Sequence, residues 1–169
     1  MPGRRRPGAP NETGRVTDLR VGVVDVFVVR PRPDGWQVLV LQRAADTRCP
    51  GAWEAVHGSI EAGERPEHAA VREVREETGL PVERLYNVTA HPFYVHATGL
   101  VQVAVVFVAF VADAGDVALG DEHRDHVWLP LDEALTRFVW PRERSTLRDA
   151  HALLAGGDAG PVEDVLRVF

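Results

Sequence analysis

The stretch "GSIEAGERPEHAAVREVREETGL" (residues 58–80) carries six glutamates in a chain that is otherwise rich in valine and alanine. Three of them, Glu73, Glu76 and Glu77, have the spacing that places side chains on one face of a helix. Like charges this close together raise each other's pKa and resist burial, so the arrangement is costly at the margin of a core. It indicates either a surface helix with ion pairs to its arginines, or oxygen ligands converging on Mg²⁺ or Mn²⁺.

The helix itself is predicted over Pro66–Thr78. A proline suits the first turn, where its missing N–H removes no hydrogen bond. Gly79, followed by Leu80 and a proline, is typical of a helix end. One apolar stripe would pack on the core, made of Ala70, Val71, Val74 and Thr78.

The sequence on either side of this helix predicts strands. The runs "LRVGVVDVFVVR" (19–30) and "WQVLVLQR" (36–43) are joined by "PRPDG" (31–35), which indicates a β-hairpin. The run "LVQVAVVFVAFVA" (100–112) is apolar on both faces and is predicted to be a central strand. Further elements are expected as short strands in 53–63, a strand in 84–96, a strand ending at Trp128, helices in 131–139 and 141–155, and an amphipathic end of the chain.

Length and composition favour one globular domain. Residues 1–14 are rich in Pro, Gly and Arg and are predicted to be a disordered tail, leaving residues 15–169 as a single domain. The formal net charge of −6 argues against binding to nucleic acid or to an anionic membrane. The apolar run at 21–29 is too short to span a bilayer. The single cysteine, Cys49, favours a reducing, cytoplasmic location.

The spacing of the glutamate-rich stretch carries a family resemblance. Gly58 is followed after five residues by Glu64, then after seven residues by Arg72 and Glu73, and then by Glu76, Glu77 and Gly79. This chain resembles the Nudix hydrolase family, whose box has this pattern. The resemblance implies an α+β fold, a mixed αβα sandwich in which the box forms a loop–helix–loop. It also implies hydrolysis of a small-molecule phosphoanhydride, a nucleoside diphosphate linked to another group.

The same resemblance implies roles for individual residues. Glu73, Glu76 and Glu77 would bind Mg²⁺ or Mn²⁺, together with the backbone carbonyl of His57. Arg72 would orient these carboxylates, and Glu64 would support them without binding metal itself. Gly58 would permit the tight loop. The catalytic base could come from the box or from a loop outside it.

Outside the box the likeness is to dihydroneopterin triphosphate pyrophosphohydrolases, which also cleave some deoxynucleoside triphosphates. It is carried by "WEAVHGSIEAGE" (53–64) and "DEHRDHVWLPLDEAL" (121–135). On that likeness Glu122 is a further metal ligand or the base; the other interpretation is a solvated turn. His123 and His126 are predicted to be surface histidines, with a site for a softer metal as the alternative. The short connection "AHPFYVHATGLVQ" (90–102) departs from the longer insertion of that subgroup, which leaves a house-cleaning hydrolase for other substrates, such as ADP-ribose, as an alternative.

Candidate substrate-binding residues are Arg43 and four aromatic side chains. Arg43 would contact a phosphate, or form a surface ion pair. The aromatic rings would stack on a base or pterin, or belong to the core; they are Trp53, Phe93, Tyr94 and Trp140. A non-catalytic nucleotide-binding module is the alternative from another functional class, and would bind a ligand without turnover. Homodimers occur in the family, but no exposed apolar stripe in the sequence argues for one.

Overall fold

The computed structural model describes residues 17–112 and 115–169, and its centre is one mixed seven-stranded sheet. The tail predicted over residues 1–14 lies outside the described residues. Along one path the strand order is β3-β2-β1-β6-β5, with β4 paired to β1 and β7 paired to β2. The strands are β1 (Leu19–Arg32), β2 (Gly35–Arg43), β3 (Trp53–Glu54), β4 (Val56–Ser59), β5 (Val82–Val95), β6 (Leu100–Val111) and β7 (His123–Pro130).

The pairing confirms the main strand predictions. β1 and β2 form the expected hairpin, closed by the pair Arg32 and Gly35, and the glycine supplies a φ of 127° that other residues rarely adopt. β6 lies between β1 and β5, parallel to the first and antiparallel to the second, as its two apolar faces predict. β7 runs two residues beyond the predicted end at Trp128, because Pro130 still pairs with Gln37 of β2.

Two short strands step across the sheet beside β1. β3 pairs with β2, whereas β4 pairs with residues 23–26 of β1. The single residue between them, Ala55, is therefore the point at which the chain passes from one neighbour to the other. Glu54 lies directly before Ala55 and His57 lies two residues after it. Both are therefore near the point where the antiparallel partner of β1 changes from β4 to β2.

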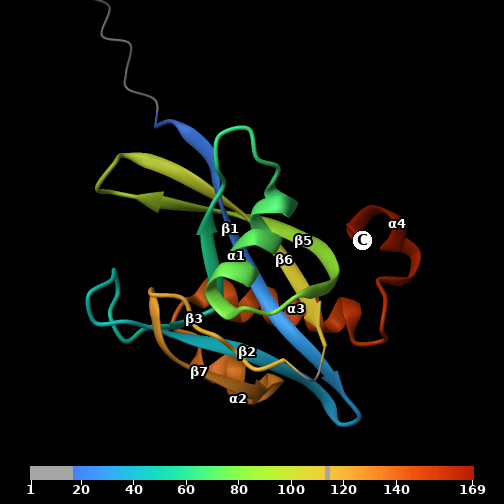
Figure 1. The fold of residues 1–169 in the computed structure, drawn as a ribbon. Helices are drawn as coiled ribbons and strands as arrows, with labels where there is room; N and C mark the ends of the chain where they lie inside the picture. The colour runs from blue at the N-terminus through green and yellow to red at the C-terminus, as the bar shows by residue number, and fades with distance from the viewer. Residues whose placement is uncertain (1–16, 113–114) are drawn as a thin grey trace, which may run out of the picture.

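Helices cover both faces of the sheet (Figure 1). Helix α1 (Pro66–Thr78) lies on one face, over a core that includes Val24, Leu39 and Phe107. Helices α2 (Leu131–Arg137) and α3 (Pro141–Leu154) cover the other. The αβα sandwich is thus confirmed. Among the described residues, no helix has the length and apolar character needed to cross a membrane.

Helix α1 has the predicted bounds. Its first residue is Pro66, and Gly79 ends it in the left-handed conformation (φ 72°), donating its N–H to the carbonyl of Arg75. Its buried face contains Ala69, Ala70 and Val74, but also Glu77. The carboxylate cluster therefore reaches into the core at the C-terminal end of the helix.

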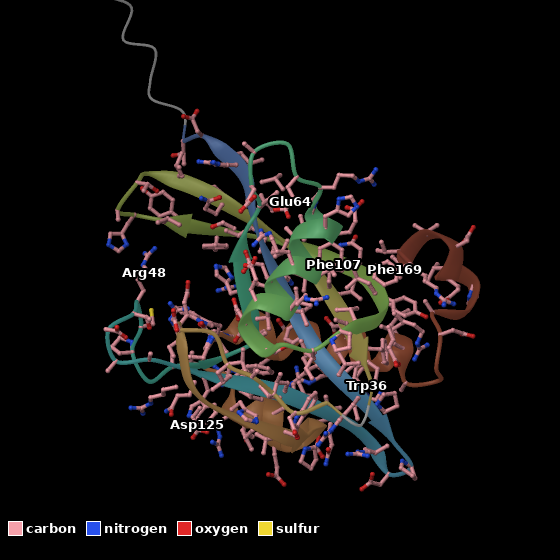
Figure 2. The ribbon with its side chains drawn as sticks, viewed as in Figure 1. Trp36, Arg48, Glu64, Phe107, Asp125 and Phe169 are labelled. Atoms are coloured by element: carbon pink, nitrogen blue, oxygen red, sulfur yellow. The ribbon has the colours of Figure 1, made fainter. Side chains whose placement is uncertain are left out.

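The end of the chain returns to the sheet. After the short helical turn η1 (Gly160–Val162) and helix α4 (Glu163–Leu166), Val168 donates its N–H to the carbonyl of Leu85, and Leu85 donates to Phe169. The hydroxyl of Tyr86 donates to Glu163 over 3.0 Å. Figure 2 shows Phe169 beside β5, at the side of the sheet far from the loop that contains Arg48.

Packing of α1 on the sheet gives a first prediction. Val74 has no exposed surface, so Val74→Ala should leave a cavity and lower the free energy of unfolding by about 2 kcal/mol. Val71 lies on the same helix but is only partly buried, so Val71→Ala should lower the free energy of unfolding by clearly less. Urea denaturation of both variants measures the difference, and equal losses would show that α1 packs differently.

Candidate functional site

The guanidinium of Arg72 donates hydrogen bonds to acidic residues of α1 and of the loop before it. Its Nε and Nη2 donate to the two carboxylate oxygens of Glu64 over 3.0 and 2.9 Å. Its Nη1 donates to Glu73 over 2.7 Å and to Glu76 over 3.1 Å, and Nη2 also donates to the carbonyl of Ser59. The paired hydrogen bonds from Arg72 lower the pKa of Glu64 to about 2. One guanidinium thus holds three glutamates that the sequence pattern singled out, and Figure 2 places Glu64 where the loop enters α1.

Gly58 is the closest point between strand β4 and the carboxylates. A Cβ on Gly58 would lie 1.9 Å from the carboxylate carbon of Glu73, which no real contact permits. The Glu73 side chain therefore lies against the bare backbone of β4. Burial raises the pKa of Glu73, and the Arg72 guanidinium opposes that effect.

Glu77 is the buried member of the cluster, with 6% of its surface exposed. Its Oε2 is fully buried and has no hydrogen-bond partner among the described residues. Burial first, and then the charges of Glu73, Glu122 and Glu54, raise its pKa to about 9, although the backbone N–H of His57 favours the charged form. In the absence of metal this carboxyl is protonated at neutral pH.

Glu122 reaches the cluster from a loop that packs on the end of α1. Gly120 donates its N–H to the carbonyl of Glu77, and Ala118 donates to Thr78. The carbonyl of Glu122 accepts the N–H of Ala44, while its side chain, 61% exposed, accepts a hydrogen bond from Arg43 over 3.1 Å. The loop is therefore fixed through its backbone, and the Glu122 carboxylate faces the same hollow as those of α1.

These carboxylates line one cavity of about 140 Å³, together with Gly120 and Asp121. Glu73, Glu76, Glu77 and Glu122 all contribute, so the donor set consists of the hard oxygen ligands that Mg²⁺ and Mn²⁺ prefer. The unpartnered buried oxygen of Glu77 is a group that a cation would satisfy. Within residues 17–112 and 115–169, no three acidic, histidine or cysteine side chains are already close enough to hold one ion. The hard oxygen donors of the cavity and the unpartnered oxygen of Glu77 fit a divalent metal.

Glu54 and His123 are buried near the cavity; the sequence did not single out Glu54, and it predicted a surface position for His123. Glu54 accepts hydrogen bonds from Arg43 (2.8 Å) and from the indole N–H of Trp140 (3.2 Å). The prediction of a surface position for His123 is wrong: its side chain is 1% exposed, because the pairing of β7 with β2 turns it inward. His126 is only partly exposed.

On the α3 side of the sheet a second group of charges surrounds Asp25 of β1. The carboxylate of Asp25 contacts Nδ1 of His57 and accepts a hydrogen bond from Arg142 over 3.2 Å. Burial raises the pKa of Asp25, but these two partners outweigh it and hold the pKa below its usual value. The His57 imidazole is thus bound on the face of the sheet opposite α1, which leaves its backbone as the part near Glu77.

The candidate substrate-binding residues are not gathered at the cavity. Trp53 packs with the core on the α3 side, under the guanidinium of Arg137. Trp140 contacts Glu54, and Tyr94 is 61% exposed on β5. Arg43 is the member of this set that contacts a cavity residue, Glu122. Phe93 packs against Arg142.

Comparison with known proteins agrees with this geometry. The model of the NUDIX domain matches residues 19–150. Among solved structures, an Ap4A hydrolase of Caenorhabditis elegans superposes with a TM-score of 0.67 at 26% identity, covering 79% of this chain and 97% of that one. The ORF135 protein of Escherichia coli superposes with a TM-score of 0.61 at 29% identity, covering 85% and 96%.

Curated relatives are matched over part of their length. An octanoyltransferase of Myxococcus xanthus is 34% identical over 76% of this chain and 36% of that protein. A Mycobacterium tuberculosis protein, provisionally named 8-oxo-dGTP diphosphatase 3, is 36% identical over 58% of this chain and 45% of that protein. The chain thus spans less than half the length of either relative.

The close approach of Gly58 to Glu73 predicts the effect of adding one methyl group. Gly58→Ala should displace the Glu73 side chain and weaken Mn²⁺ binding by about 10–100-fold, while the fold persists. Gly156→Ala is the control, because a Cβ there meets nothing within 4 Å. Titration with Mn²⁺ followed by electron paramagnetic resonance measures the affinity, and unchanged binding in Gly58→Ala would contradict the packing described here.

The raised pKa of Glu77 predicts a pH-dependent stability of the metal-free protein. Between the ordinary value of 4.5 and about 9, the folded protein keeps a proton that the unfolded chain has lost. The contribution of Glu77 to stability therefore falls as the pH rises through this range. Glutamine does not titrate, so Glu77→Gln should gain stability over the wild-type protein, by at most about 1.4 kcal/mol for each pH unit.

Denaturation in EDTA at pH 5, 7 and 8.5 tests this expectation. Glu83→Gln, at an exposed position on β5, is the matched control and should follow the wild-type protein. If the wild-type and Glu77→Gln proteins show parallel pH profiles, Glu77 is ionised in the metal-free fold and the description of its burial is wrong.

Proposed function

Since the chain belongs to the NUDIX domain family, we propose that it is a divalent-metal-dependent hydrolase that cleaves a phosphoanhydride bond in a small, nucleotide-like substrate. The observation that carries the proposal is the convergence of Glu73, Glu76, Glu77 and Glu122 on one cavity, with Arg72 and Arg43 attached to its rim. A helix that used its charges only for solvation would not bury Glu77 with an unpartnered oxygen.

In this proposal some residues of the chain bind the metal and others orient the metal-binding carboxylates. Mg²⁺ or Mn²⁺ would be held by Glu73, Glu76 and Glu77 with the backbone carbonyl of His57, and Glu122 would be either a further ligand or the base. Arg72 keeps Glu73 and Glu76 turned toward the cavity, and Glu64 fixes Arg72 from the other side. The bound metal would neutralise charge on the phosphate oxygens and lower the pKa of the attacking water.

A carboxylate must also accept the proton of that water. Glu122 suits this role, because its side chain is 61% exposed, lies outside the box and accepts a hydrogen bond from Arg43. Glu77 is less suited while it is buried and protonated. A glutamate within the box is the alternative base. Comparing kcat of Glu122→Gln with kcat of the glutamine variants of the box distinguishes the two candidates.

The substrate is proposed at the level of a class. The likeness around residues 53–64 and 121–135 supports dihydroneopterin triphosphate or a deoxynucleoside triphosphate. The names of the related proteins add two further candidates, a dinucleoside tetraphosphate and 8-oxo-dGTP. All four present a phosphoanhydride to metal and an aromatic ring system to the rest of the site, so one assay covers them.

A panel of these substrates and ADP-ribose in Mg²⁺, with pyrophosphate and orthophosphate measured separately, tests the proposal. We expect metal-dependent release from at least one compound, and a fall in kcat of about 10²–10⁴-fold in Glu122→Gln if it is the base. Glu73→Gln should instead weaken Mn²⁺ binding as well as kcat. Glu83→Gln is the control for a lost surface charge.

A non-catalytic nucleotide-binding module is the second candidate. It would show a thermal shift with a nucleotide and Mg²⁺ but no turnover of any compound in the panel. Turnover that persists in EDTA would contradict both functions.

A further inference from the structure

Glu54 is the centre of a buried network that lies outside the box. Its carboxylate is 5% exposed and takes hydrogen bonds from Arg43 and Trp140, with Nε2 of His123 3.7 Å away. Burial raises its pKa, but these three neighbours more than offset that effect and keep the pKa below its usual value. Glu54 therefore stays ionised while it is almost completely shielded from water.

His123 stands between this carboxylate and Glu77. Its Nε2 lies 3.7 Å from Oε1 of Glu54, and its Nδ1 lies 3.7 Å from Oε2 of Glu77. Both ring nitrogens and Oε2 of Glu77 are buried and without a hydrogen bond in the described structure. One ring nitrogen of His123 thus faces each carboxylate.

Arg43 continues the network to the other side of the cavity. Its Nη1 contacts Glu54 and its Nη2 contacts Glu122, while its Nε donates to the carbonyl of Arg48. A continuous series of contacts therefore runs from Glu77 through His123, Glu54 and Arg43 to Glu122. It joins two cavity carboxylates that come from different elements, helix α1 and the loop before β7.

We propose that His123 is a positioning residue, which holds the Glu77 carboxylate in the geometry that binds metal and is itself anchored by Glu54. The inference rests on the proposed function, since it concerns how the same cavity binds its metal. Side chains that contact metal ligands in this way typically change metal affinity by about 10–100-fold when they are replaced. A buried imidazole that only filled space would be replaceable by an apolar side chain of similar size.

Replacing His123 with asparagine or with glutamine distinguishes the roles of its two ring nitrogens. Asparagine places an amide near the position of Nδ1, which faces Glu77, whereas glutamine places one near Nε2, which faces Glu54. We expect Mn²⁺ affinity close to that of the wild-type protein in His123→Asn, and about 10–100-fold weaker in His123→Gln and His123→Leu. Glu54→Gln should weaken it as well, because the anchor of His123 is lost.

The experiment is a Mn²⁺ titration of the full chain without substrate, followed by kcat and KM for the best substrate of the panel. His96→Asn is the control, at an exposed position in the turn between β5 and β6. The proposal predicts that kcat falls with metal affinity at subsaturating Mn²⁺, recovers as Mn²⁺ is raised, and leaves KM nearly unchanged.

Four results would overturn it. Wild-type affinity in folded His123→Leu would mean that the imidazole only fills space. Rescue by glutamine and not by asparagine would mean that the contact with Glu54, rather than that with Glu77, is the important one. Metal-independent hydrolysis by a wild-type protein that binds no Mn²⁺ would overturn the proposed function too, whereas Mn²⁺ binding and turnover unaffected by every His123 variant would overturn the inference alone.

Discussion

Repulsion among carboxylates is the constraint on which the rest of this structure depends. In the proposed function Glu73, Glu76 and Glu77 share a cation, but without one the charge of Glu76 raises the pKa of Glu73, and the charge of Glu73 raises the pKa of Glu77. The fold reduces this repulsion in two ways. Arg72 neutralises the outer pair, and burial keeps Glu77 protonated until something replaces its proton.

The position of the cluster depends equally on the sheet. Gly58 lets Glu73 lie against β4, and the step at Ala55 brings Glu54 to the margin of the same cavity. The two arginines then connect the layers: Arg72 joins the helix to the loop before it, and Arg43 joins β2 to β3 and to the loop before β7. No single element contains the site, which is assembled where α1, β3, β4 and that loop meet.

Much of the fold around the cavity could be predicted from the sequence, because it depends on the spacing of residues that are close together in the chain. The bounds of α1, its C-terminal glycine, the β1–β2 hairpin and the central position of β6 all follow from periodicity and turn chemistry. The family resemblance implied that Arg72 orients Glu73, Glu76 and Glu77; in the structure the carboxylates that accept its hydrogen bonds are those of Glu64, Glu73 and Glu76.

What could not be predicted depends on pairing between distant strands. The burial of His123 results from the register of β7 on β2, and a charged run such as "DEHRDH" gives no sign of which side chain turns inward. Glu54 precedes the box by four residues, but its partners come from β2, β7 and the start of α3. The aromatic candidates were chosen by type alone, and the structure gives most of them packing partners instead.

The loop before β7 is attached to its neighbours by main-chain hydrogen bonds, from Ala118, Gly120 and Ala44. Main-chain groups are the same whatever the side chain, apart from proline, so most residues of this loop can be exchanged during evolution while Glu122 keeps its place. Gly120 is an exception, since a Cβ there would lie 2.9 Å from the carbonyl oxygen of Glu76, and Val117 and Leu119 are others, since they pack against the core. A lineage could therefore vary the rim of the cavity, and with it the molecules admitted, without disturbing the carboxylate that the loop delivers.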